Sequence, residues 1–195
     1  MGRTVLVSGA ASGLGDEAEN IEFLQVDITS ESSLKDLAAF VADKPIDLLI
    51  HSAGIRGLVP DLERLHHGDI AACETLAVMT PETMQKTFAV NSVGTFNLIR
   101  GLLPNLRKSP DSKVVVISSR MAAQNAIVKS FSIDVPEVAF VLCHPGRVET
   151  GLVQWKEEGA ISVEESVNGL LPLIEKWGKA DSGKFYDRFG EPILW

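Results

Sequence analysis

The sequence predicts an α/β fold with a doubly wound, mainly parallel sheet that is flanked by helices. Three observations support this class: short β-branched apolar runs, amphipathic helical segments between them, and a glycine-rich stretch directly after the first run. Runs that are apolar on both faces are typical of strands covered on both sides. Alternating strand and helix patterns are typical of a parallel sheet. With 195 residues and no repeat or linker, residues 1–195 are expected to form a single domain.

Six apolar runs are expected to be strands. They cover residues 3–8, 21–26, 46–52, 113–119, 138–143 and, more weakly, 184–187. Four segments with an apolar stripe at helical spacing are expected to be helices, and they cover residues 32–44, 80–108, 122–134 and 162–179. Ser33 with Asp36, and Ser162 with Glu165, have the spacing of capping boxes, and Thr80 precedes a proline at the first helical position.

The composition excludes several classes of partner. The chain is 45% hydrophobic and 23% charged, with a net charge of −8 and no long Lys/Arg cluster. Nucleic acid and anionic membranes are therefore not expected partners, and no apolar run approaches the length of a membrane span. The first strand begins near residue 3, which leaves no room for a signal peptide. Cys143 lies in an apolar run and Cys73 in a polar segment, so we expect no disulfide and a cytoplasmic location.

Glycines follow the first expected strand in the pattern G-x-x-x-G-x-G, at Gly9, Gly13 and Gly15. Glycine permits a tight turn there and lets backbone N–H groups approach a pyrophosphate, and a helix that starts at the turn adds a favourable dipole. The alternative is a glycine-rich turn that binds nothing. The position of the motif after the first strand favours nucleotide binding.

The spacing after this loop is unusually short. Only residues 16–20 separate Gly15 from the next apolar run. Parallel neighbours need a crossover of about a dozen residues, usually a helix. An antiparallel hairpin could close the gap, but it would leave the glycine loop without its helix. Either the chain folds differently here, or a segment is missing near residues 15/16. We favour the missing segment, because the downstream order is as expected.

Six motifs occur in order along the chain: VLVSGAASGLG, VDIT, HSAG, VNSVG, VISS and HPGRVET. In this order they resemble the short-chain dehydrogenase/reductase family, NAD(P)-dependent oxidoreductases with one Rossmann-type domain. The C-terminal segment from Ser162 onward is similar to the C-factor/sniffer-like subgroup. The resemblance implies a Rossmann-type, doubly wound sheet and an oxidoreductase.

The resemblance also implies a set of cofactor-binding residues. The pyrophosphate would lie at Gly9, Gly13, Leu14 and Gly15, the adenine at Asp27 and Ile28, the adenosine ribose at Ala53 and Gly54, and the nicotinamide at Pro145, Gly146, Val148 and Thr150. His51 and Ser52 stand where the family usually has two asparagines, so the bonds that stabilise the sheet there are left open.

Two catalytic residues are implied. Ser119 would hydrogen-bond the substrate carbonyl, and Asn91 would lie at a helix irregularity and order a proton-relay water. Most of these residues follow strand ends, where ligands bind in open α/β sheets. Each also has a structural alternative: Asp27 as a cap, Ser119 bonded to its own backbone, and Asn91 as a locally satisfied amide.

The family reaction also needs a tyrosine and a lysine spaced Y-x-x-x-K, with the tyrosine as acid or base and the lysine lowering its pKa. The sequence has one tyrosine, Tyr186, and Gly190 stands four residues after it. The resemblance places the missing pair in a second absent segment near residues 121/122. Lys129 lies well along its helix, where a solvated side chain is expected.

Two explanations remain open for the absent pair. Either the native protein contains residues that this sequence lacks, and it is an enzyme, or the chain is a genuine short form. A short form would be a catalytically inactive nucleotide-binding or signalling protein. We favour the enzyme.

We therefore expect an NAD(P)-dependent oxidoreductase that acts on a small-molecule carbonyl or secondary alcohol. The sequence does not separate NAD from NADP, nor does it identify the substrate. A homodimer or homotetramer is implied by the family resemblance. No metal is expected, since the polar stretch with His66, His67, Asp69, Cys73 and Glu74 lacks convincing ligand spacing and is better explained as a loop over the substrate cleft.

Overall fold

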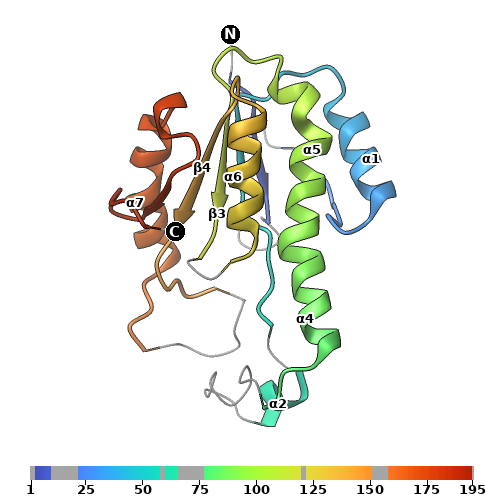
Figure 1. The fold of residues 1–195 in the computed structure, drawn as a ribbon, viewed down its shortest axis with the longest axis vertical. Coiled ribbons are helices and arrows are strands. Elements are labelled where there is room, and N and C mark those ends of the chain that lie inside the picture. The colour runs from blue at the N-terminus through green and yellow to red at the C-terminus, as the bar shows by residue number, and fades with distance from the viewer. Residues whose placement is uncertain are drawn as a thin grey trace.

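The computed structural model describes residues 3–9, 22–57, 60–65, 77–119, 122–150 and 158–194. Its sheet has five strands in the order β1-β2-β3-β4-β5, and every neighbouring pair is parallel (Figure 1). The strands are β1 (Val5–Ser8), β2 (Leu48–His51), β3 (Lys113–Ile117), β4 (Ala139–His144) and β5 (Phe185–Asp187). The predicted fold class, a parallel sheet flanked by helices, is confirmed.

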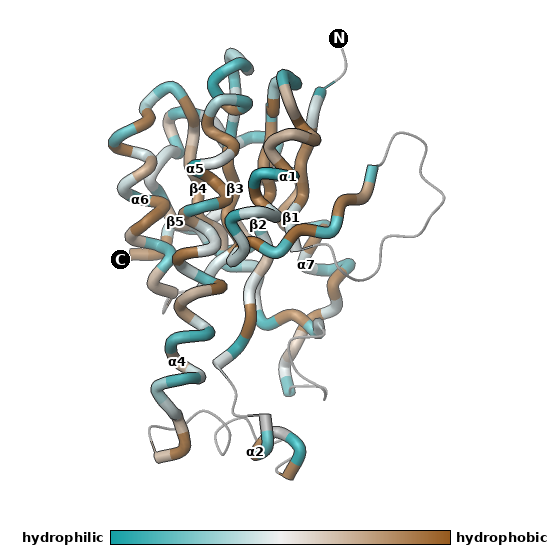
Figure 2. The backbone as a smooth tube through the Cα atoms, turned by 90° about the vertical axis from the view of Figure 1, so that its right-hand side faces the viewer, coloured by the Kyte–Doolittle hydropathy of each residue, from teal (hydrophilic) through white to brown (hydrophobic). Residues whose placement is uncertain are grey.

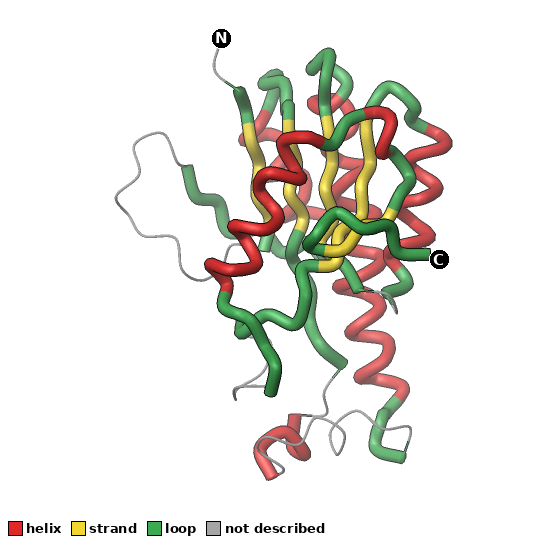
Figure 3. Tube along the Cα trace, turned by 90° about the vertical axis from the view of Figure 1, so that its left-hand side faces the viewer, coloured by secondary structure: helices red, strands yellow, loops and turns green. Residues whose placement is uncertain are grey.

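Helices cover both faces of the sheet. α1 (Glu31–Val41), α5 (Thr95–Leu106) and α6 (Gln124–Asp134) lie on one face, and α7 (Val163–Lys176) crosses the other (Figures 1 and 3). Because neighbouring residues of a strand point to opposite faces, alternate residues enter the two cores. Val114 and Val116 pack in the larger core beneath α5, while Val115 and Cys143 pack beneath α7. Hydrophobic residues are accordingly concentrated along the strands (Figure 2).

The predicted helix 80–108 is divided into three parts. α4 (Pro81–Phe88) begins after the N-cap Thr80, whose side chain accepts a hydrogen bond from the Thr83 N–H at 3.2 Å. A π-helical segment, η1 (Ala89–Gly94), joins α4 to α5. Such segments often occur at functional sites. α4 extends beyond the carboxyl ends of the strands, where the short helix α2 (Pro60–Leu65) also lies (Figures 1 and 2).

Two of the predicted caps have different outcomes. Ser162 caps α7 by accepting from the Glu165 N–H at 3.0 Å, as predicted. The box predicted at Ser33 and Asp36 is wrong, because α1 begins one residue earlier and Ser30 is its N-cap. The Ser33 N–H donates to Ser30 Oγ at 3.3 Å instead.

The predicted strand 21–26 does not form. Residues 22–27 are irregular, and Phe23 and Leu24 expose 56% and 41% of their surface. Among the described residues, β1 pairs only with β2, and Val5 and Val7 remain about half exposed. A strand needs a neighbour of matching direction, and the interval after Gly15 is shorter than a parallel crossover requires. The prediction of a strand at 21–26 is therefore wrong, because an apolar pattern does not report whether a partner strand is available.

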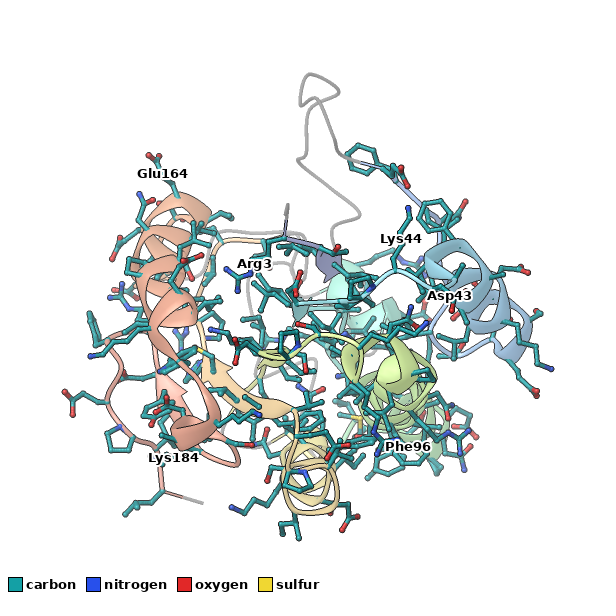
Figure 4. All side chains as sticks on the ribbon, turned by 90° about the horizontal axis from the view of Figure 1, so that it is seen from above. Arg3, Asp43, Lys44, Phe96, Glu164 and Lys184 are labelled. Atoms are coloured by element: carbon teal, nitrogen blue, oxygen red, sulfur yellow. The ribbon has the colours of Figure 1, made fainter. Side chains whose placement is uncertain are left out.

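The amino edge of the sheet is fixed by a buried lysine. Lys113 is 6% exposed, and its Nζ donates to the carbonyls of Ile174 (2.6 Å) and Trp177 at the end of α7. These carbonyls have no partner within the helix, so the ammonium caps it. Trp177 is buried and stacks on Tyr186 with 5.2 Å between ring centroids, so it belongs to the core beneath α7. Arg3 reaches Glu175 of the same helix end at 3.4 Å, and Figure 4 shows Arg3 between β1 and α7.

Replacing Gly9 by alanine is expected to destabilise the protein by at least about 2 kcal/mol. Gly9 has φ +86°, and a Cβ there would lie 2.4 Å from the Ala53 nitrogen. Gly101 in α5 is the matched control, because a Cβ there meets nothing within 4 Å. Gly101→Ala should stabilise by about 0.5 to 1 kcal/mol, since glycine weakens a helix interior. Urea unfolding of both variants makes the comparison, and equal effects would show that the Gly9 turn is not sterically constrained.

Candidate active site

The parallel register brings the carboxyl ends of four strands to one edge. Ser8 is opposite His51, His51 is opposite Val116, and Ile117 is opposite Cys143. The segments that follow these strands therefore leave the sheet at the same edge. They contain Gly9, Ala53 and Gly54, Ser119, and Pro145 and Gly146, which the sequence analysis assigned to one site.

The turn after β1 consists of bare main chain. Gly9 packs so closely against residues 52 and 53 that no side chain fits there. The ends of β1 and β2 are also tied together, because Ser52 donates to the Ser8 carbonyl from its backbone N–H at 3.0 Å and from its Oγ at 3.1 Å. This turn fits a phosphate-binding loop, in which the backbone must approach the ligand directly. Gly13, Leu14 and Gly15 lie outside the described residues.

Asp27 and Ile28 do not follow a strand, contrary to expectation. Asp27 Oδ1 accepts from the Thr29 N–H at 2.8 Å and from Thr29 Oγ1 at 2.7 Å, and these bonds lower the pKa of the carboxyl. Ile28 is buried, and its Cγ1 would lie 2.8 Å from a Cβ at position 94. The structure thus places Asp27 in a local turn before α1 and Ile28 against Gly94 of η1.

Asn91 lies in the π-helical segment η1, which is the helix irregularity expected at this position. Its Oδ1 accepts from the Ile55 N–H at 2.8 Å, and its Nδ2 donates to the Ile55 carbonyl at 2.7 Å. The amide therefore clamps the segment that follows β2. The Asn91 carbonyl accepts from Thr95 Oγ1 at 2.8 Å. The side chain is satisfied locally, and whether Asn91 also orders a water stays a prediction.

The two serines after β3 have different surroundings. Ser118 is buried, and its Oγ accepts from Gln124 Nε2 at 3.0 Å and donates to Asn125 Oδ1. Ser119 is exposed, and its carbonyl accepts from Asn125 Nδ2 at 2.9 Å. The start of α6 therefore holds the backbone of Ser119, and this residue is exposed at the carboxyl edge. The importance of Gln124 and Asn125 was not predicted, because the sequence pattern gives no sign of what a polar residue at a helix start contacts.

The segment after β4 is supported by α7 and the residues before it. Gly146 has φ +90°, and Ser166 Oγ donates to the Pro145 carbonyl at 2.9 Å. Val148 pairs with Ile161, whose N–H donates to the Arg147 carbonyl at 2.8 Å. Thr150 is exposed at the end of this segment. The residues assigned to the nicotinamide thus form a short, braced strip at the same edge.

His51 supplies the sheet bonds that the sequence analysis had left open. It is 1% exposed, with Nδ1 2.6 Å from Ser8 Oγ and Nε2 2.8 Å from Thr95 Oγ1. Burial lowers the pKa of His51 to about 4. The imidazole is therefore neutral at physiological pH and acts as a hydrogen-bonding bridge between β1, β2 and α5.

Neither Tyr186 nor Lys129 belongs to this site. Tyr186 OH donates to Asp181 Oδ1 at 2.7 Å, and burial together with this carboxylate raises the pKa of the phenol to about 12. Asp181 precedes β5, so the phenol points toward the amino edge of the sheet. Lys129 Nζ donates to the Gly183 carbonyl at 3.1 Å, so the ammonium is held beside the turn before β5. Neither side chain can replace the family tyrosine or lysine.

Metal and membrane features do not emerge from the described parts of the chain. No group of three or more His, Cys, Asp or Glu side chains there could hold a metal ion. The polar stretch with His66, His67, Asp69 and Cys73 lies outside the described residues. Within the described ranges, no helix is both long and apolar enough to cross a membrane.

A comparison with protein families establishes the family to which the chain belongs. The family described as short chain dehydrogenase matches residues 6–132, which is more than half of the chain. The chain belongs to the short-chain dehydrogenase family. Membership supports oxidoreductase chemistry in general.

Individual relatives extend over most of the chain. C-signal of Myxococcus xanthus is 28% identical over 182 residues, which cover 83% of this chain and 100% of C-signal. An NADPH-bound carbonyl reductase from chicken fatty liver is similar in structure, with a TM-score of 0.71 and 21% identity over 87% of this chain and 75% of its own. The carbonyl reductase Sniffer of D. melanogaster is also similar in structure, with a TM-score of 0.68 and 20% sequence identity. The match covers 88% of this chain and 77% of Sniffer. At these identities the structural matches show the shared fold.

His51 is expected to make stability depend on pH. Its pKa of about 4 in the folded state lies below the ordinary value of 6.5, so the unfolded state binds more protons between these values. The free energy of unfolding should therefore fall as pH drops from 6.5 toward 4, by about 3 kcal/mol in all. Urea unfolding across this range measures the effect, and His51→Gln should remove that part of the slope. An unchanged slope in the variant would show that His51 is not the group responsible.

Proposed function

We propose that this protein is an NAD(P)-dependent oxidoreductase that transfers hydride between a nicotinamide cofactor and a carbonyl or secondary alcohol. One observation carries the proposal: a side-chain-free turn at Gly9, the Asn91 clamp and the exposed Ser119 all lie at the carboxyl edge of one parallel sheet. Ligands bind at this edge in open α/β folds. The family assignment supports the same chemistry.

The cofactor would lie across the strand ends. Its pyrophosphate would be held by Gly9 together with Gly13, Leu14 and Gly15, its adenosine half by Asp27, Ile28, Ala53 and Gly54, and its nicotinamide by Pro145, Gly146, Val148 and Thr150. Asp27 fits this role least directly, because Oδ1 is already bonded to Thr29. The NADPH-bound relative of similar fold supports a nicotinamide dinucleotide, without distinguishing NAD from NADP here.

The protein's own contribution is orientation and polarisation. When bound, the nicotinamide accepts or supplies the hydride. Ser119 would hydrogen-bond the substrate oxygen, and its backbone is fixed for this by Asn125. Asn91 would hold a water beside the substrate. A donor aimed at the oxygen that gains charge stabilises the transition state.

The described site does not supply the acid that the family reaction uses. The sole tyrosine of the sequence is bonded to Asp181 toward the opposite edge. General acid–base catalysis typically contributes about 10²- to 10⁴-fold. We propose that segments are absent near residues 15/16 and 121/122, and that the protein containing the second one, with Tyr-x-x-x-Lys, turns over faster by this factor.

A second candidate function rests on this same observation. Without the tyrosine and lysine, the chain would be a catalytically inactive nucleotide-binding or signalling protein on the same fold. The similarity to C-signal, whose name denotes a signal, is compatible with this alternative. Both candidates predict dinucleotide binding, and they differ in turnover. For either one, a cytoplasmic location and a homodimer or homotetramer remain part of the proposal.

Thermal unfolding with NAD(H) and NADP(H), followed by a cofactor-oxidation screen against ketones and quinones, tests the proposal. The enzyme predicts a higher melting temperature with one dinucleotide and oxidation with at least one carbonyl. Ser119→Ala should then keep the thermal shift and lose about 10²-fold or more in kcat. A thermal shift without oxidation in the native gene product, including any residues near 15/16 and 121/122 that this sequence lacks, identifies the inactive alternative. No shift with either dinucleotide contradicts both.

A further inference from the structure

A buried chain of hydrogen bonds runs from the glycine turn to Ser119. Ser8, which precedes Gly9, contacts His51, and His51 contacts Thr95. Thr95 Oγ1 lies 3.3 Å from Gln124 Oε1. Gln124 donates to Ser118, Ser118 donates to Asn125, and Asn125 donates to the Ser119 carbonyl. The chain thus joins the ends of β1, β2 and β3 through α5 and α6.

The protons of this chain fit one arrangement best. Thr95 Oγ1 has a single hydrogen, and both of its partners besides His51, the Asn91 carbonyl at 2.8 Å and Gln124 Oε1 at 3.3 Å, are acceptors that share this hydrogen. His51 must then donate from Nε2 to Thr95 and accept at Nδ1 from the Ser8 hydroxyl. The other neutral tautomer would draw the Thr95 hydrogen to Nε2 and leave both the Asn91 carbonyl and Gln124 Oε1 without this donor. Neutral His51 with its proton on Nε2 therefore accepts a hydrogen bond from the Ser8 hydroxyl at the end of β1. It also leaves the Thr95 hydrogen available to the Asn91 carbonyl in η1.

Burial makes the central links of the chain consequential, while Ser8 at one end is half-buried and Ser119 at the other end is exposed. Thr95 is 0% exposed, and Gln124, Ser118 and Asn125 are 6–7% exposed. A buried polar group that loses its partner cannot turn to water instead, so removing one link disturbs its neighbours. Exposed hydrogen bonds would not transmit such a change.

We propose that His51 is a positioning residue that fixes Ser119 relative to the glycine turn, acting through Thr95, Gln124 and Asn125. His51 does not touch Ser119. It sets the orientation of the Thr95 hydroxyl, which lies between η1 and the start of α6. The inference rests on the proposed function, under which the orientation of Thr95 would align the substrate-binding Ser119 with the dinucleotide.

Three substitutions distinguish the hydrogen bond that His51 makes through Nδ1 from the one that it makes through Nε2. The amide of glutamine lies near the position of Nε2, so His51→Gln retains the bond to Thr95. The shorter asparagine places its amide near Nδ1, so His51→Asn retains only the bond to Ser8. His51→Leu removes both. Ser109→Ala is the matched control, because Ser109 is 6% exposed and donates to Asp47 Oδ1 at 2.6 Å near the amino edge.

Hydrogen–deuterium exchange of the complete chain tests the inference without requiring activity. We expect residues 118–125 to exchange at least 10-fold faster in His51→Leu and His51→Asn, with His51→Gln and Ser109→Ala close to wild type. Exchange in α7 should stay unchanged, which separates a local effect from a general loss of stability. Unchanged exchange at 118–125 in His51→Leu would overturn the inference, as would an equal increase throughout the chain.

Kinetics add a readout that depends on the proposed function. For a carbonyl that the wild type reduces, His51→Leu should lower kcat at least 10-fold while the dinucleotide KM changes less than threefold, and His51→Gln should restore kcat. A KM change alone would contradict the positioning role. Absence of dinucleotide binding in the wild type would refute the proposed function, while the exchange experiment would still decide the role of His51.

Discussion

The close approach of Gly9 to residues 52 and 53 is the constraint on which the rest of the site depends. The end of β1 can lie against the segment after β2 only because position 9 has no side chain. Two hydrogen bonds from Ser52 to the Ser8 carbonyl keep the strands together at this point. The parallel register then brings the segments after β3 and β4 to the same edge. The site is therefore a consequence of strand pairing.

Much of the fold could be predicted from the sequence because it depends on local pattern. Neighbouring residues predict the strands β3 and β4, whose runs are apolar on both faces. They also predict the helix N-caps Thr80 and Ser162. The run 21–26 carries the same pattern, yet pairing needs a partner strand and a crossover of sufficient length, which local pattern does not report. The candidate site residues at the strand ends were predicted from family motifs, and their roles stay predictions. The hydrogen bonds of His51 with Thr95 and of Ser118 with Gln124 could not be predicted, because they join segments that only the tertiary structure brings together.

The structure separates the scaffold of the family from its chemistry. The turn, the π-helical segment with its asparagine and the serine after β3 are present in a protein whose only tyrosine serves the packing of α7 against β5. Under the proposed function, binding and orientation use the first set of features, and proton transfer requires a side chain beyond them. A dinucleotide site and a catalytic site can therefore differ by one segment of chain.

Mapping the bound dinucleotide on the sheet is the most direct test of this account. Backbone amide shifts or exchange protection should be followed while NADH or NADPH is titrated into the protein. The account predicts changes at residues 8–9, 52–54 and 145–150, together at the carboxyl edge. Changes confined to the amino edge, around Arg3 and Lys113, or no change with either dinucleotide, would contradict it.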